Sequence, residues 1–170
     1  MAAQAKSAEP GLEGKSGREG KYLTFTLAKE EYGIGILKVR EIFGMMTITP
    51  VPQTPAFVKG VINLRGKVIP VLDLRLKFGM PELDYNERTS IIVVEVTSRT
   101  EKIQIGLVVD SVSEVTSIKA EEIEDAPAFG ASLNTDFILG MAKKAGGVKI
   151  LLDIDRVLTE GELEALDSAA

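Results

Sequence analysis

The sequence predicts a mainly β protein built from two copies of one small β unit. Apolar and polar residues alternate along several short segments, which is the period of a half-buried strand. The block 57–78 recurs at 137–158 without a gap, which indicates an internal duplication. The chain is also rich in Val, Ile and Thr, the branched residues that sheets favour. Helices are therefore expected to be few and short.

Composition excludes much chemistry. The 170 residues contain no Cys, no His and no Trp, and they carry a formal net charge of −5. A thiolate nucleophile, a Ser/His/Asp triad, the usual zinc and haem sites and a disulfide framework are therefore excluded. Lys and Arg are scattered rather than gathered in a stripe, which argues against binding to nucleic acid or to an anionic membrane. We expect a protein partner, no cofactor and no metal.

Residues 1–20 differ in composition from the rest of the chain. They contain several Gly, a Pro and charges that cancel, with Leu12 as the only large apolar residue after the initiator Met. Such a segment cannot bury enough surface to offset its ordering entropy, so we expect a mobile tail that is dispensable for folding. No apolar run approaches the ~18 residues of a membrane span, and no signal sequence is present. The sequence predicts a soluble, cytoplasmic protein.

The first structured elements should be strands. Apolar residues alternate at 23–27 and again at 32–36 after a polar break, which predicts a β-hairpin. The run 91–96 is continuously apolar apart from one Glu, which indicates a strand buried on both faces. The pattern alternates again at 103–109. The segments 34–36 and 39–42 are echoed faintly at 105–107 and 112–115, with a two-residue insertion between the pieces.

Each repeated block is expected to form a strand, a turn, a second strand and a helical turn. Gly66 and Gly146 lie where a hairpin needs a residue that can adopt positive φ. We expect Val68 and Val148, and likewise Leu72 and Leu152, to occupy equivalent core sites. The identical pairs are Phe57/Phe137, Gly60/Gly140, Gly66/Gly146, Val68/Val148, Leu72/Leu152 and Asp73/Asp153.

Asp73 and Asp153 each follow the second strand of their block and precede apolar residues at helical spacing, so we interpret them as N-caps. The alternative, a hard-cation site at Asp153 and Asp155, lacks further ligands and the Gly of an EF-hand loop. Thr159 and Glu162 form the capping-box pattern that opens a short C-terminal helix. The segment 119–125 is expected to form one acidic turn.

The remaining motifs are weak. Gly33 and Gly35 lack the third glycine of a dinucleotide loop, and no phosphate-binding loop sequence is present. Prolines between 50 and 55 are expected to form a rigid connector rather than an SH3 ligand. Beside them, the cluster of Phe43, Met45 and Met46 has two interpretations, core packing or an adaptable partner surface.

The two copies differ at their hairpin tips. The first has Arg65 before its glycine, and the second has Ala145 at the same position. Hairpin geometry therefore does not require Arg65. An exposed Arg on a rigid turn is either a solvated charge or a fixed fork for a carboxylate on a partner.

Three segments carry a family resemblance: EEYGIGILKVREI at 30–42, TPAFVKGVINLRGKVIPVLDLRLKFG at 54–79 and IGLVVDSVSEV at 105–115. They resemble the CheW-like domain family of bacterial chemotaxis, and the match runs from about Tyr22 to Leu166. The resemblance implies two five-stranded SH3-like β-barrels that share a hydrophobic interface within residues 21–160, with exchange of strands between them left open. Residues 161–170 would form the short C-terminal helix.

The resemblance also implies a function. It implies a non-catalytic adaptor that couples chemoreceptors to the histidine kinase CheA, in the cytoplasm but associated through its partners with receptor arrays at the inner membrane. Val39, Glu41 and Arg65 match positions associated in the family with binding of the cytoplasmic receptor tip, a helical hairpin. Lys59 and Gly60 are candidates for contact with the regulatory domain of CheA, and the cluster of Phe43, Met45 and Met46 is a weaker candidate.

Alternatives from other classes were weighed. The regulatory domain of CheA and CheV-type couplers share the fold, but a receiver alone would add on the order of a hundred residues. An SH3- or OB-like barrel that binds another protein or single-stranded nucleic acid is the main alternative. For nucleic acid it would need a basic groove and stacking aromatics, and an acidic chain with six Phe and three Tyr does not favour this. A carboxylate-based hydrolase rests only on the presence of acids.

Overall fold

A computed structural model describes residues 15–98, 101–127, 136–144, 147–159, 161–163 and 166 of the chain. Within this part, no helix is long and apolar enough to cross a membrane. The short helices are α1 (Lys15–Arg18), η3 (Ile36–Lys38), α2 (Leu74–Lys77), η4 (Ala120–Glu122) and η5 (Ile154–Arg156). The strands are β1 (Gly20–Leu27), β2 (Glu30–Gly35), β3 (Val39–Gly44), β4 (Val58–Leu64), β5 (Lys67–Asp73), β6 (Ser90–Ser98), β7 (Glu101–Val109), β8 (Ser111–Ile118), β9 (Ile123–Glu124), β10 (Ile138–Lys144) and β11 (Gly147–Leu152).

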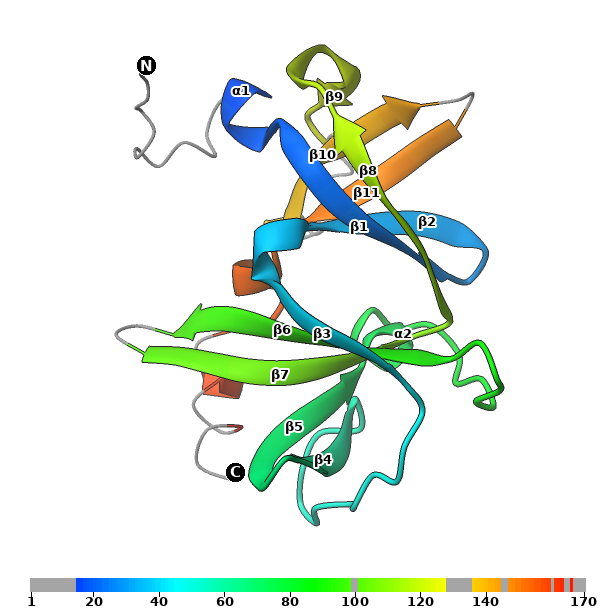
Figure 1. The fold of residues 1–170 in the computed structure, drawn as a ribbon, viewed down its shortest axis with the longest axis vertical. Coiled ribbons are helices and arrows are strands. Elements are labelled where there is room, and N and C mark those ends of the chain that lie inside the picture. The colour runs from blue at the N-terminus through cyan, green and yellow to red at the C-terminus, as the bar shows by residue number, and fades with distance from the viewer. Residues whose placement is uncertain are drawn as a thin grey trace.

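The strands form two sheets, one above the other in Figure 1. The upper sheet has the order β8-β1-β2-β11-β10-β9, and the lower sheet has the order β3-β6-β7-β5-β4. The prediction of a mainly β fold with two SH3-like barrels is confirmed. The lower sheet has the five strands expected, and the upper one adds the two-residue strand β9.

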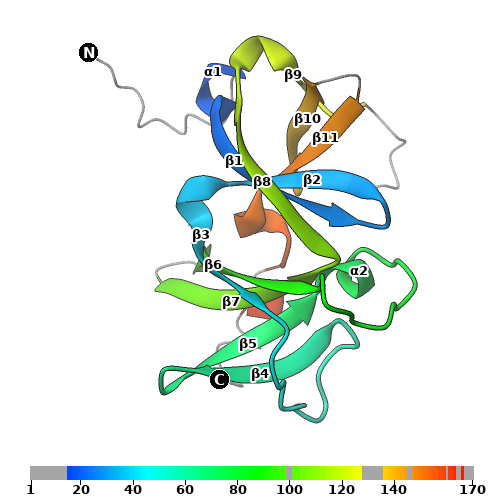
Figure 2. The ribbon, with the colours of Figure 1, turned by 45° about the vertical axis from the view of Figure 1, so that its right-hand side comes forward.

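The two copies of the repeat exchange strands. The first copy comprises β1 to β5 and the second comprises β6 to β11, yet each sheet takes strands from both. The chain crosses between sheets at η3, after β2, and again at residue 110, between β7 and β8. Figure 2 shows β8 rising from the end of β7, beside α2, to the upper sheet. Each barrel therefore needs both copies, which answers a point that the sequence left open.

In each sheet, one further segment pairs with the edge strand, β4 or β10, and so helps to close the barrel. Thr49, beyond β3, bridges to Val61 in β4, and Glu124 in β9 pairs with Met141 in β10, the counterpart of Val61. Gly60 permits the first of these approaches. Its φ is +142°, and a Cβ built there would lie 2.0 Å from the carbonyl oxygen of Thr49. A side chain at residue 60 would therefore push the two segments apart.

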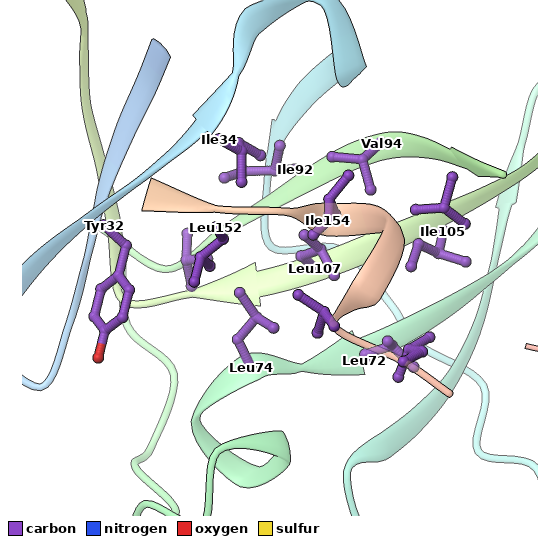
Figure 3. Packing of buried hydrophobic residues seen from close by; sticks show 14 of the residues in the cluster. Tyr32, Ile34, Leu72, Leu74, Ile92, Val94, Ile105, Leu107, Leu152 and Ile154 are labelled. Carbon is purple, nitrogen blue, oxygen red and sulfur yellow. The ribbon is translucent and has the colours of Figure 1, made fainter. Parts of the chain in front are cut away.

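The largest hydrophobic core lies between the barrels and draws on both sheets, as Figure 3 shows. Smaller clusters fill the interior of the lower barrel, around Ile62 and Ile69, and of the upper barrel, around Tyr22 and Leu151. Side chains that meet in the shared core include Tyr32, Ile34, Leu72, Leu74, Ile92, Val94, Ile105, Leu107, Leu152 and Ile154.

Most local predictions hold. The first hairpin turns at Ala28 and Lys29, both with positive φ, and the run beginning at Ile91 is buried on both faces in β6. The carboxylate of Asp73 accepts from the backbone N–H groups of Arg75 and Leu76, and that of Asp153 accepts from the N–H of Asp155. Both aspartates are therefore N-caps.

Near the C-terminus, Thr159 and Glu162 exchange hydrogen bonds as a capping box, and residues 161–163 and 166 are helical. The second hairpin tip, Ala145 and Gly146, and the last residues, 167–170, lie outside the described part.

One core assignment is wrong. Val68 and Val148 are 45% and 52% exposed, whereas Leu72 and Leu152 are buried as predicted. Both valines stand one residue after the start of their strand, at the end of its ladder with the preceding strand. Because both members of each pair share one environment, the duplication itself is supported.

The predicted tail boundary is also wrong for residues 15–20. Lys15–Arg18 form α1, β1 begins at Gly20, and the Arg18 side chain is only 7% exposed. Its guanidinium donates to Asp125 at 2.9 Å and to the carbonyl oxygen of Leu139 at 2.8 Å. Composition cannot reveal a partner more than 100 positions away, so this segment was misassigned. Residues 1–14 lie outside the described part.

The corrected core gives a matched set of substitutions. Leu72→Ala and Leu152→Ala should each lower the free energy of unfolding by ~2–5 kcal/mol, because each empties a buried site. Val68→Ala and Val148→Ala should each lower it by less than about 1 kcal/mol, because these side chains are half exposed. Urea unfolding followed by circular dichroism measures all four. Equal losses for Leu and Val would contradict the assignment of the core.

Candidate functional site

The structure brings together two of the three predicted receptor-binding residues. Glu41 lies in β3 and Arg65 lies in the turn between β4 and β5, and their side chains form an ion pair, the Glu41–Arg65 pair. The Arg65 side chain is 67% exposed and that of Glu41 is 33% exposed. An ion pair this open contributes little to stability, because water screens it. It does hold the guanidinium in a defined place on the surface.

The third residue, Val39, begins β3 directly after the η3 crossing. Its side chain is partly buried and packs against the shared core. A bulge in the pairing with β6 separates Val39, opposite Val94, from Glu41, opposite Val93. Arg40 is the extra residue and donates two hydrogen bonds to Glu95. Val39 therefore links the surface around Glu41 to the interface between the barrels.

Arg65 occupies an unusual backbone conformation. Its φ is +54° and that of Gly66 is +87°, and the Gly66 N–H donates to the side chain of Asn63 at 2.8 Å. Two successive residues with positive φ form the hairpin turn that Asn-Gly sequences prefer. An Arg whose backbone adopts the left-handed conformation lowers stability by roughly 1–2 kcal/mol relative to the right-handed conformation. Turn geometry therefore disfavours Arg at this position, which points to a role for its side chain.

Two apolar side chains in β3 and β8 are exposed, and the sequence did not identify them as site residues. Ile42 in β3 is 45% exposed and Val115 in β8 is 49% exposed. They are equivalent positions of the faint echo, and Figures 1 and 2 both show β3 and β8 on the same side of the molecule. The signal in the sequence was that both copies keep an apolar residue at this position.

The kinase-contact candidates lie at a different place in the lower barrel. Lys59 in β4 forms an ion pair with Glu82 at 3.1 Å, and its Nζ lies 5.7 Å from the centre of the Tyr85 ring. Gly60 is buried, and its place is explained by the approach of Thr49. An apolar groove of about 460 Å³ adjoins Lys59 and is lined by Met45, Met46, Ile48, Pro50, Ala56, Val58, Lys59 and Tyr85.

The methionine cluster serves both interpretations. Phe43, Met45 and Met46 are partly buried and pack against the core of the lower barrel. Met45 and Met46 also line the groove beside Lys59. We call this depression the methionine groove. Thioether side chains adapt to different partner shapes, so the groove could accept apolar side chains from another protein.

Asp153 and Asp155, the alternative cation site of the sequence, both make contacts within the protein. Among the described residues, no group of three or more Asp or Glu side chains could hold a metal ion. Asp153 caps η5, and Asp155 pairs with Lys38 at 2.7 Å. Burial raises the pKa of Asp153 above its ordinary value. These two side chains therefore have structural partners in place of a cation.

Comparison with known proteins identifies the family. The CheW-like domain matches residues 21–162, which is most of the chain. The chain belongs to the CheW-like domain family. Chemotaxis protein CheW of Klebsiella aerogenes is 43% identical over 150 residues, covering 88% of each chain. Chemotaxis protein CheW of Rhizobium meliloti is 36% identical, covering 88% of this chain and 92% of its own.

A solved structure agrees. The crystal structure of scaffolding protein TtCheW from Thermoanaerobacter tengcongensis matches with a TM-score of 0.75 and 36% identity, covering 85% of this chain and 97% of that one. The relatives are chemotaxis proteins and the solved one is a scaffolding protein, so the comparisons support an adaptor role in chemotaxis.

The strained turn yields a stability prediction. Arg65→Asn should leave the free energy of unfolding unchanged or raise it by up to about 1 kcal/mol, since Asn-Gly suits the turn and the lost ion pair is exposed. Urea unfolding measures this. Glu41→Gln is the control, because it removes the pair without touching the turn, and it should change the value by less than about 1 kcal/mol. A larger loss in Arg65→Asn would mean that Arg65 holds the barrel together.

Proposed function

We propose that this chain is a non-catalytic adaptor that couples methyl-accepting chemoreceptors to the histidine kinase CheA, so that receptors control autophosphorylation of the kinase. The observation that carries the proposal is the Glu41–Arg65 pair. A strained, exposed Arg forms an ion pair with a carboxylate on the surface, although neither folding nor turn geometry calls for it. An arginine placed in this way suits recognition of a partner.

The receptor-binding surface would comprise Val39 and the Glu41–Arg65 pair, with Ile42 on the opposite face of β3, which is an edge strand of its sheet. A helical receptor tip presents apolar side chains at helical spacing, and these would pack on Val39 and Ile42. The two charges would fix the register and orientation of the helix.

The kinase-binding surface would be the methionine groove with Lys59 at its edge. The regulatory domain of CheA would place apolar side chains in the groove, and Lys59 would exchange Glu82 for an acidic partner. Gly60 would contribute indirectly, because it lets Thr49 approach β4 and so shapes the wall of the groove.

One strand joins the two surfaces. Val39 begins β3 and Met45 follows its end, so along an extended chain they are about 20 Å apart. β3 is paired to β6 from Val39 to Gly44, so one paired strand joins the receptor residues to the methionine groove beyond its end. A receptor and the kinase could then bind together, and a shift imposed at one end would reach the other through a rigid element. The adaptor would act in the cytoplasm and be held at receptor arrays by its partners.

Receptor binding can be tested at the Glu41–Arg65 pair. Arg65→Glu and Glu41→Lys should each weaken binding of a receptor cytoplasmic fragment by about tenfold or more, because each reverses a charge at the contact. Receptor-stimulated autophosphorylation of CheA should fall with it, while circular dichroism shows a folded protein.

Glu114→Lys is the matched control, because Glu114 is the exposed counterpart of Glu41 in β8. It should leave receptor binding within about twofold, less than about 0.5 kcal/mol. If folded Arg65→Glu and Glu41→Lys proteins stimulate the kinase as well as the unmodified protein does, the receptor assignment is wrong.

Kinase binding can be tested separately at the methionine groove. Lys59→Glu combined with Met46→Asp should weaken binding of the CheA regulatory domain by about tenfold or more and leave the receptor fragment bound normally. Calorimetry with each partner measures both effects. Loss of both partners together would indicate misfolding, and retention of the kinase would contradict this surface. Salt-dependent binding to single-stranded nucleic acid by the unmodified protein would favour the alternative barrel function.

A further inference from the structure

The duplication creates two equivalent sites, one in each barrel, and only one of them is filled. The first adjoins Asp73 and has a free volume of about 10 Å³. The second adjoins Asp153 and has a free volume of about 440 Å³. We call them the filled site and the open site. Their walls correspond through the two repeats. In the block repeat, Asp73 and Arg75 match Asp153 and Asp155. At the offset of the faint echo, Thr89 and Val108 match Arg18 and Leu37.

A segment of the chain itself occupies the filled site. Leu83, Asp84 and Tyr85, between α2 and β6, line it; the Tyr85 side chain is half-buried there, and Leu83 is 46% exposed at its edge. The Tyr85 hydroxyl donates to Oδ2 of Asp73 at 2.8 Å, while Oδ1 of Asp73 caps α2. Burial and this hydrogen bond raise the pKa of Tyr85, so the phenol remains a donor at neutral pH. The carboxylate thus serves the helix with one oxygen and the phenol with the other.

The open site has the same carboxylate, but no phenol among the described residues donates to it. Tyr22 also lines this site, and its hydroxyl donates to the carbonyl oxygen of Arg18. Oδ1 of Asp153 accepts from the N–H of Asp155 at 3.2 Å, as a cap should. Its Oδ2 forms an ion pair with Arg156, whose Nε lies 3.6 Å away, beyond hydrogen-bond distance, so Oδ2 can still accept a hydrogen bond. The Asp153 side chain is nevertheless 16% exposed, so that oxygen faces little water. The position that Tyr85 fills in one barrel therefore has an acceptor to offer in the other.

Two more observations indicate a missing occupant. Arg18 is 93% buried at the wall of the open site, and its Nε has no hydrogen-bond acceptor among the described residues. A buried donor without an acceptor lowers stability, and an occupant that supplies an acceptor would recover this loss. Leu37 is 88% exposed at the same wall, and Ile36, Leu139, Leu152 and Ile154 complete an apolar lining.

The occupant cannot be a tyrosine of this chain. The chain has three, and the structure uses them all: Tyr22 and Tyr32 are buried in the barrels, and Tyr85 fills the filled site. The segment after η5 runs elsewhere, since Glu162 pairs with Lys77 of α2 and Leu166 joins the shared core. Residues 1–14 contain no aromatic residue.

We propose that the open site binds a segment of a partner protein that carries a tyrosine two residues after an apolar residue, as Leu83 and Tyr85 do in the filled site. The tyrosine hydroxyl donates to Oδ2 of Asp153, the apolar residue packs against Leu37, and a backbone carbonyl accepts from Nε of Arg18. The site adjoins η3, the crossing that leads into β3, so its occupant would contact the segment just before Val39. This inference goes beyond the proposed function and does not depend on it.

The chain supplies its own probe, the synthetic peptide MPELDYNERT of residues 80–89. Titrated into the full-length protein, it should shift the amide NMR signals of Gly35 to Lys38 and of Leu139 in a saturable way. The same peptide with Tyr85→Phe should bind about tenfold more weakly, because it cannot donate to Asp153.

Two protein variants place the binding. Leu37→Asp should weaken it about tenfold without unfolding the protein, because this side chain is almost fully exposed. Val148→Asp, at an exposed valine outside the open site, should not change it. Three results would overturn the proposal: no shifts at millimolar peptide, equal binding of the two peptides, or shifts confined to the filled site around Val108. A requirement to remove residues 1–14 first would also overturn it, since the chain would then cover its own site.

Discussion

Neither copy of the repeat can close a barrel alone, and the rest of the structure depends on this exchange. β1 and β2 of the first copy pair with β8 and β11 of the second, while β6 and β7 of the second pair with β3 and β5 of the first. The shared core then forms where the two barrels press together. Because each half supplies the hydrogen-bonding partner of the other, the barrels should fold as one cooperative unit rather than as independent domains.

The two crossings are fixed by ion pairs of opposite polarity at equivalent places. At the first, Lys38 of η3 pairs with Asp155 at 2.7 Å. At the second, Asp110 pairs with Arg75 at 2.7 Å, and Arg75 is the counterpart of Asp155. Each carboxylate also accepts a hydrogen bond from the backbone of a neighbouring hairpin. Asp155 accepts from the N–H of Thr97, and Asp110 accepts from the N–H of Ala28. Charge reversal between the copies keeps each crossing from pairing with the wrong partner, because the wrong pairing would bring like charges together.

Features that depend on neighbouring residues could be predicted from the sequence, whereas contacts between distant residues could not. The repeat, the hairpins and the caps at Asp73 and Asp153 follow from periodicity and turn chemistry, which act over a few residues. The exchange could not be predicted, because alternation assigns residues to faces and says nothing of which strand lies alongside. Arg18 was missed since its ion pair spans 107 positions. The residues of the Glu41–Arg65 pair came from family resemblance, and only the fold could reveal that they touch.

Divergence between the copies shows where the duplication has been put to separate uses. The core positions Leu72 and Leu152 remain alike because both barrels must close. The differences lie at the hairpin tip, where the first copy has the exposed Arg65, and at the paired sites, where Tyr85 lines one and the other remains open. Both differences adjoin β3 or the crossing that leads into it. A change at either place therefore acts on a strand that is paired along one edge and attached at its start to both barrels, and such a strand moves with the barrels rather than bending alone.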